Sequence, residues 1–223
     1  MTVAENTQAI EARVAQACQK AGRDRSEVHL VAVTKYVTPE KAQEVVDAGV
    51  TELAENRVDK FLEKYQALAG NQITWHLIGS LQRRKVKDVI NKVDYFHALD
   101  SVKLAQEIDK RADHPVACFL QVNVSGEESK HGFAPEDIDA ALDVIGTLDK
   151  VRIIGLMTMA PIDADHDALE KLFEETNQLR ASLAKQNREG MTFSELSMGM
   201  SRDFPEAIAH GATFVRVGTA FFE

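Results

Sequence analysis

The chain has 223 residues, a length that suits one large domain or two small ones. Its hydrophobic fraction of 44% and charged fraction of 27% are ordinary for globular proteins, which excludes disorder as the main state. The net charge of −9 argues against a broad nucleic-acid surface. No apolar run reaches the roughly 20 residues of a membrane span, and the polar N-terminus is unlike a signal peptide, so we expect a cytoplasmic protein.

Short apolar runs rich in Val, Ile, Phe and Thr predict eight strands. Several runs are continuous rather than alternating, as in parallel strands that are buried on both faces. The predicted strands are residues 28–35, 51–56, 73–79, 94–99, 116–124, 151–159, 192–198 and 213–218.

Segments of helical character separate the strands, and a further helix is expected over about 4–21, before the first strand. Thr38-Pro39-Glu40, Ser101 and Pro135 have the residue types that begin helices. The longest helix is expected from about Asp167 to Asn187, where apolar residues recur every three or four positions.

Alternation of strand and helix predicts a parallel sheet, and eight such units predict a (β/α)8 barrel with an extra N-terminal helix. A doubly wound open sheet is the alternative, because counting strands does not establish closure. We expect residues 1–223 to form a single domain, since no linker or repeat interrupts the pattern. Active-site groups of such barrels lie at the carboxyl ends of the strands, so the search for chemistry begins there.

The first predicted strand ends in Thr34-Lys35-Tyr36. A lysine at this end would project into the barrel mouth, where desolvation favours the neutral amine that attacks a carbonyl. Position alone leaves open the alternative that Lys35 begins a loop with its ammonium group in water.

The seventh predicted strand continues into Ser197-Met198-Gly199-Met200-Ser201-Arg202-Asp203 and then a short helical segment. Glycine permits close approach of the backbone to a ligand, and Ser201 and Asp203 are residue types that cap helix starts. A capped helix start of this kind binds anions. An ordinary capped turn is the alternative.

The eighth predicted strand ends in Arg216-Val217-Gly218-Thr219. Alternation places Arg216 and Gly218 on one face, and barrel closure would bring Arg216 near Lys35. An ion pair is the alternative fate of a buried arginine. Together, an amine nucleophile, a phosphate-binding loop and an internal arginine match what pyridoxal 5′-phosphate (PLP) requires.

Other kinds of site have little support in the sequence. The seven histidines show no paired helical spacing, and Cys18 and Cys118 belong to no C-x-x-C and are expected to be reduced thiols, so no metal site is expected. Dinucleotide, P-loop and G-x-S-x-G motifs are absent from the sequence. The basic cluster at 82–87 is typical of a solvated helix face.

Specific motifs cover nearly the whole chain and occur in one characteristic order: VTK, GLMTM, LSMGMS-x-D and RVGT. By these motifs the chain resembles the pyridoxal phosphate homeostasis protein family. The segments that carry the resemblance are LVAVTKYVTPEKAQEVVDAG (30–49), AENRVDKF (54–61), WHLIGSLQRRK (75–85), HALDS (97–101), QVNVSGEESKHGF (121–133), GLMTMAP (155–161), LSMGMSRDFPEAIAHGAT (196–213) and RVGTAFF (216–222).

The resemblance implies an alanine-racemase-like barrel in which Lys35 carries PLP as an internal aldimine, its Schiff base. It places Arg216 at the pyridine nitrogen and Asn56 and Met198 among the cofactor-contacting residues. The residues that it places at the phosphate are Ser201, Gly218 and Thr219.

The chain departs from the family pattern at three places. Arg84 stands where asparagine is common, which puts any anion contact of that asparagine in doubt. Asp59-Lys60 replaces Gln-Glu, and the sequence ends in Phe222-Glu223 in place of Phe-Gly.

Two functions are then open. The first is a non-catalytic PLP-binding protein of intracellular PLP homeostasis, expected to be a monomer, with PLP-dependent apo-enzymes as potential partners. The alternative is a PLP-dependent amino-acid racemase of the same fold. Racemases of this fold bring a second acid/base, typically a tyrosine, from a separate domain, and we expect no room for one after the eighth strand. A positively charged arginine at the ring nitrogen also makes the ring a poorer electron sink, so we favour the first.

Overall fold

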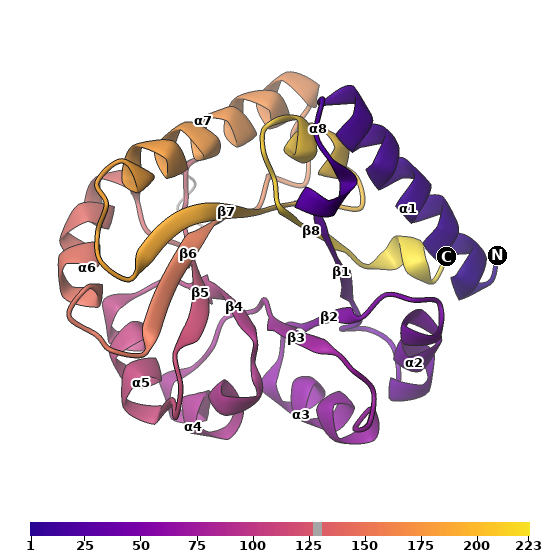
Figure 1. Cartoon of the computed structure of the whole chain (residues 1–223), viewed down its shortest axis with the longest axis horizontal. Helices are drawn as coiled ribbons and strands as arrows, with labels where there is room; N and C mark the ends of the chain where they lie inside the picture. The colour runs from indigo at the N-terminus through magenta and orange to yellow at the C-terminus, as the bar shows by residue number, and fades with distance from the viewer. Residues whose placement is uncertain (127–130) are drawn as a thin grey trace.

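The computed structural model describes residues 1–126 and 131–223, which form a closed barrel of eight parallel strands (Figure 1). Each strand pairs with the next one along the chain, and β8 pairs with β1. The predicted (β/α)8 barrel is confirmed, and the open sheet is excluded. The strands are β1 (His29–Val33), β2 (Glu52–Glu55), β3 (Thr74–Leu77), β4 (Tyr95–Leu99), β5 (Val116–Gln121), β6 (Val151–Met157), β7 (Met191–Met200) and β8 (Phe214–Val217).

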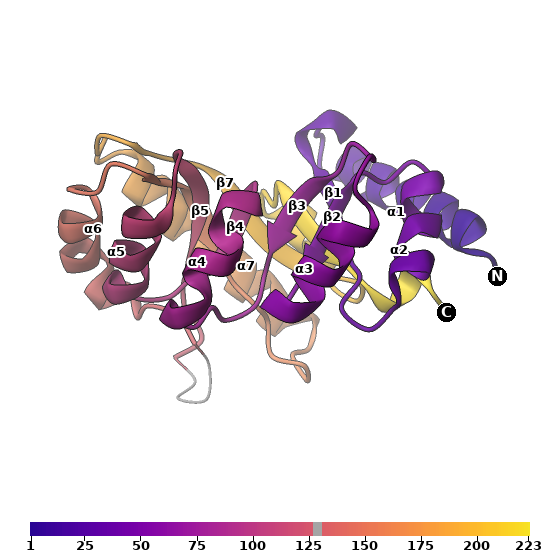
Figure 2. The ribbon, with the colours of Figure 1, turned by 90° about the horizontal axis from the view of Figure 1, so that it is seen from below.

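Helices surround the strands, and Figure 2 shows α3, α4 and α5 side by side on the outside of the barrel. The predicted N-terminal helix is present as α1. The helices are α1 (Val3–Lys20), α2 (Pro39–Asp47), α3 (Val58–Ala67), α4 (Val86–Val89), α5 (Val102–Arg111), α6 (Ile138–Ile145), α7 (His166–Ala184) and α8 (Phe204–Ala209). Among the helices of the described residues, none is both long enough and apolar enough to cross a membrane.

Capping side chains set most of the helix starts that the sequence predicts. Thr38 and Ser101 accept hydrogen bonds from backbone N–H groups three residues later, at the starts of α2 and α5. Asp165 caps α7 in the same way, so this helix begins at His166. Pro135 instead begins a 3-10 turn, and α6 starts only at Ile138.

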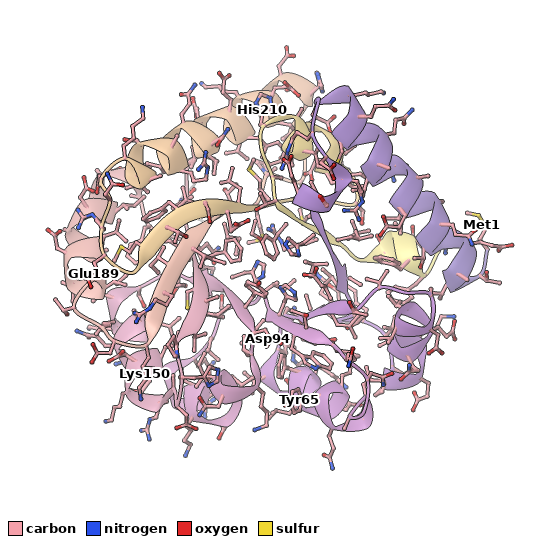
Figure 3. All side chains as sticks on the ribbon, in the orientation of Figure 1. Met1, Tyr65, Asp94, Lys150, Glu189 and His210 are labelled. Atoms are coloured by element: carbon pink, nitrogen blue, oxygen red, sulfur yellow. The ribbon has the colours of Figure 1, made fainter. Side chains whose placement is uncertain are left out.

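Aromatic rings fill the inside of the barrel at the end where the strands begin. The Phe214 ring stacks on His29 at a centroid distance of 4.2 Å and meets Phe119 edge-on at 5.1 Å. Tyr95 stacks on His76 at 5.0 Å. Figure 3 shows side chains occupying the space that the strands enclose, so the barrel is a packed core and a ligand can enter only at its ends.

The two ends of the chain meet beside the seam between β1 and β8 (Figure 1). Helix α1 packs against α8 and against the 3-10 turn Thr219–Phe221 that follows β8. Asn6, which is buried, donates from Nδ2 to the carbonyl oxygens of Phe221 at 3.0 Å and Glu223 at 2.8 Å. These bonds fix the turn that begins at Thr219.

Candidate functional site

A cavity of about 490 Å³ lies where the strands of the barrel end, a volume within the ~300–1,000 Å³ of small-molecule sites. Its wall is formed by residues at the ends of β1, β5, β7 and β8 and by the segments that follow β1, β2, β3, β6, β7 and β8. Of the seven residues expected from the sequence, the six that line it are Lys35, Asn56, Ser201, Arg216, Gly218 and Thr219. Within the QVNVSGEESKHGF segment, residues 127–130 lie outside the described residues.

Lys35 follows β1 and lines the cavity with a half-buried side chain. Its Nζ lies 4.8 Å from the centroid of the Tyr36 ring. The described residues offer this group no hydrogen bond or ion pair, so no side chain among them holds it away from a ligand in the cavity.

The backbone just before Lys35 is held by a buried ion pair. Lys64, from α3, donates from Nζ to Glu55 Oε1 at 2.7 Å and to the Thr34 carbonyl oxygen at 3.0 Å. The Thr34 hydroxyl donates to the same Glu55 oxygen at 2.6 Å. The Lys64 and Glu55 side chains are 1% and 0% exposed. This pair fixes the end of β1 from which Lys35 projects.

This ion pair was not anticipated from the sequence, although a signal existed. Lys64 lies three residues after Phe61 and six after Val58, on the buried face of α3. A lysine on the apolar stripe of a helix indicates a buried partner, because an unpaired charge is rarely buried.

Asn56 reaches the cavity because β2 and β3 come together closely where they end. A Cβ on Gly79 would lie 2.0 Å from the backbone oxygen of Asn56, so only glycine fits there. Gly79 also lines the cavity and was not singled out from the sequence.

The loop after β7 is joined to the end of β8 by a serine. Ser201 Oγ accepts the backbone N–H of Gly218 at 3.3 Å. A hydroxyl has one donor, and accepting this bond leaves the proton of Ser201 free to point at a ligand. Arg202 donates to the carbonyl oxygen of Ile162 at 2.7 Å, which ties the same loop to the segment after β6.

Ser201 and Asp203 do not cap α8 as the sequence suggested. Asp203 stands at the N-cap position, but its side chain accepts from the backbone N–H of Met200 at 2.5 Å and makes no cap bond. The carboxylate thus tightens the turn before the helix. The prediction that these side chains cap α8 is wrong, while anion binding by this loop stays a prediction.

Met198, expected to contact a cofactor, does not line the cavity, and this expectation is corrected. Ser197 turns into the barrel, so alternation directs Met198 outward, where it is fully buried in the core. Gly199 has a φ of +93° and interrupts the alternation, and Met200 lines the cavity in place of Met198.

Arg216 is a buried cation without a carboxylate partner. Its exposed fraction is 4%, and no carboxylate of the described residues lies within 4.0 Å of it. Its guanidinium donates to Ser197 Oγ at 2.6 Å and to the Thr158 carbonyl oxygen at 3.0 Å. Burial lowers the pKa of Arg216 to about 10, which leaves it charged at neutral pH. The ion-pair alternative is therefore wrong, and the charge faces the cavity.

A line of buried hydrogen bonds continues from Arg216 through the barrel. Ser197 Oγ lies 2.7 Å from His97 Nδ1, His97 Nε2 lies 2.9 Å from His76 Nδ1, and His76 Nε2 lies 3.1 Å from Glu52 Oε2. We call Glu52, His76, His97, Ser197 and Arg216 the interior network. It was not anticipated from the sequence, where the histidines were considered only for metal-binding spacing.

The protonation states of the interior network follow from its surroundings. Burial lowers the pKa of His76 and holds the pKa of His97 well below its usual range. Burial alone would raise the pKa of Glu52, but hydrogen bonds from His29 and His76 lower it to about 2. The bond to Glu52 raises the pKa of His29. At neutral pH, neutral histidines thus separate the Glu52 carboxylate from the Arg216 cation.

Arg84, Cys18 and Cys118, which were also noted in the sequence, do not line the cavity. Arg84 is exposed and donates to Gln82 Oε1 at 2.9 Å. Cys18 and Cys118 are buried free thiols, and burial raises the pKa of Cys118 to about 12. Among the described residues, no group of three His, Cys, Asp or Glu side chains is arranged to hold a metal ion.

Comparison with known proteins gives consistent results. Residues 6–223 match the family described as alanine racemase, N-terminal domain. The chain is 38% identical to the pyridoxal phosphate homeostasis protein of Aquifex aeolicus, over 100% of this chain and 98% of that protein. It is 31% identical to the protein of the same name in Escherichia coli, over 99% of this chain and 95% of that one.

Solved structures show the same fold. PipY of Synechococcus elongatus PCC7942, solved with PLP bound, superposes with a TM-score of 0.87 at 32% identity, and all of both chains is covered. An alanine racemase of Clostridium difficile superposes with a TM-score of 0.77 at 16% identity, over 98% of this chain and 56% of that one, which shows a shared fold alone.

Replacing Lys64 by methionine should destabilise the protein by ~3–5 kcal/mol, because the buried Glu55 carboxylate loses its cation. Urea denaturation followed by circular dichroism measures this loss. Lys60→Met is the matched control, since Lys60 lies on the same helix in an exposed pair with Glu63. Equal stability of the two variants would contradict the structural role of the buried pair.

The buried histidines predict that the free energy of unfolding falls as the pH drops below about 6.5. Unfolded His76 and His97 take up protons near pH 6.5, whereas the folded protein lowers both pKa values. Their contribution is thus present above pH 6.5 and lost below it, by at most ~1.4 kcal/mol per pH unit for each. His29 opposes this trend, because its raised pKa stabilises the folded state below pH 6.5.

Urea denaturation at pH 7.5, 6.5 and 5.5 tests this dependence. His97→Gln should flatten the fall in stability by removing one titration, while the exposed His114→Gln should leave the fall unchanged. A wild-type stability that stays constant or rises toward pH 5.5 would be incompatible with buried neutral histidines.

Proposed function

Because the chain belongs to the alanine racemase N-terminal domain family, and within it to the pyridoxal phosphate homeostasis proteins, we propose that residues 1–223 form one PLP-binding domain that serves PLP homeostasis. One observation carries this proposal. Lys35 and a buried arginine that makes no ion pair within 4.0 Å with a described carboxylate line the same cavity, at the mouth of the barrel.

The residues of the cavity suit PLP, which is a phosphate ester with an aldehyde and a pyridine nitrogen. When bound, PLP supplies an aldehyde that an amine can capture and a ring that can accept electrons. Lys35 provides the amine, and Arg216 provides N–H donors for the ring nitrogen. The phosphate is assigned to Ser201, Gly218 and Thr219, where the Ser201 proton is free to donate.

The same residues favour binding over turnover. Arg216 keeps a positive charge, which disfavours a second positive charge on a ring nitrogen beside it. Of the three tyrosines, Tyr36 lines the cavity, whereas Tyr65 and Tyr95 do not. The relatives are named for homeostasis and not for a reaction. We therefore propose a carrier without robust catalysis of its own.

The surroundings of the cavity bear on its partners. Tyr36 and Ile162 are 81% and 83% exposed at the rim, which suits transient contact with PLP-dependent apo-enzymes. The two free thiols agree with a reducing compartment. We therefore propose that the protein is a cytoplasmic monomer that supplies PLP to such enzymes.

Lys35 should be the residue that becomes covalently attached to PLP. Borohydride reduction of the PLP-loaded protein, followed by peptide mapping, should place the label on Lys35. Lys35→Ala should take up no borohydride-stable label, whereas Lys41→Ala, at an exposed lysine of α2, should be labelled like the wild type. A label on Lys35→Ala equal to that on the wild type would refute this assignment.

The carrier function predicts very slow exchange of the Cα protons of amino acids. PLP-loaded protein incubated with L- and D-alanine in deuterated water should exchange far more slowly than the ~1–1,000 s⁻¹ of typical enzymes, as followed by NMR. Racemisation at several turnovers per second would establish the racemase alternative instead.

A further inference from the structure

The interior network joins the cavity to the opposite end of the barrel. Its members come from five different strands: β8, β7, β4, β3 and β2. Ser197 and His97 meet across the interior, since β7 and β4 are not neighbours in the sheet. Four of the five residues are at most 4% exposed, and the Glu52 side chain is 21% exposed at the far end.

The chemistry of its two ends gives the interior network one direction. Arginine can only donate, so Ser197 Oγ accepts from Arg216, and its own O–H group can donate to His97 Nδ1. A carboxylate can only accept, so His76 must carry its proton on Nε2, which faces Glu52.

The middle of the interior network then has one solution. His76 Nδ1 has no proton, so it accepts from His97 Nε2–H. This leaves His97 Nδ1 without a proton, so it accepts from the Ser197 hydroxyl. The Glu52 carboxylate thus imposes the Nε2–H tautomer on both histidines, and every bond in the series has a donor and an acceptor.

We propose that Glu52 is a positioning residue for the cofactor site: its carboxylate sets the tautomers of His76 and His97, and these orient the Ser197 hydroxyl to accept from Arg216. Glu52 thereby holds the Arg216 guanidinium at the floor of the cavity from the other end of the barrel. This inference rests on the proposed binding of PLP.

Loss of the Glu52 charge should reverse the series. In Glu52→Gln, an N–H donor replaces one of the two carboxylate oxygens. Where this N–H faces His76 Nε2 and the amide oxygen faces His29, the proton of His76 moves to Nδ1. His97 then donates from Nδ1 to Ser197, so the hydroxyl oxygen accepts from both His97 and Arg216, and its own proton loses its acceptor on His97. The Ser197 hydroxyl is then no longer oriented by His97, which weakens its hold on Arg216.

The first test measures the tautomers directly in the cofactor-free protein. Imidazole ¹⁵N NMR at pH 7.5 should show Nε2–H for His76 and His97 in the wild type, and protons on Nδ1 in Glu52→Gln. Glu170→Gln is the matched control, because Glu170 also binds a histidine, His210, at 2.7 Å and lies outside the interior network. Nδ1–H tautomers in the wild type would overturn the inference.

The second test measures PLP binding by the same proteins. Glu52→Gln should weaken PLP binding about tenfold, the loss of one hydrogen bond to a charged group, while Glu170→Gln should bind like the wild type. Ser197→Ala, which breaks the series of hydrogen bonds beside Arg216, should weaken PLP binding by a similar factor. It replaces Glu52→Gln as the test variant if Glu52→Gln does not fold. Unchanged PLP affinity in these variants would overturn the inference. If the proposed function itself were wrong, the wild type would bind no PLP, and this result distinguishes the two failures.

Discussion

A guanidinium inside a closed barrel has lost its water, and the protein must replace that water with acceptors. Arg216 finds two, the Thr158 carbonyl and the Ser197 hydroxyl, and neither carries a charge. No described carboxylate pairs with it within 4.0 Å, and Asp203 acts on its charge only from farther away. The guanidinium lines a cavity that a polar ligand can enter. Much of the barrel interior helps to hold this one side chain, because the Ser197 hydroxyl is hydrogen-bonded to His97 and His97 is hydrogen-bonded to His76.

Two separate polar groups of residues place the two ends of the site. On one side, Lys64 and Glu55 hold the Thr34 backbone and so the base of Lys35. On the other, the interior network holds Arg216. The pairing of β1 with β8, which sets Val31 opposite Arg216, brings Lys35 and Arg216 to one cavity. Each group is buried, so neither depends on a ligand to stay in place.

The sequence was sufficient for features that depend on local pattern. Strand runs, helix caps and the strand ends that carry Lys35 and Gly218 are encoded by neighbouring residues. Met198 points away from the cavity because its neighbour Ser197 turns inward. Met200 lines the cavity instead because Gly199 adopts a positive φ that interrupts the alternation, which no pattern of apolar residues reveals. The contact of His76 with His97 depends on the register of β3 on β4, and their link to β7 depends on barrel closure. Such long-range geometry is absent from a single sequence.

The seam between β1 and β8 also governs when the site can exist. Residues 214–223 leave the ribosome after every other strand, yet they supply Arg216, Gly218 and the carbonyl groups that Asn6 binds. Without β8, one edge of β1 would have no partner strand. The wall of the cavity that carries Arg216 and Gly218 is therefore complete only once β8 has closed the barrel.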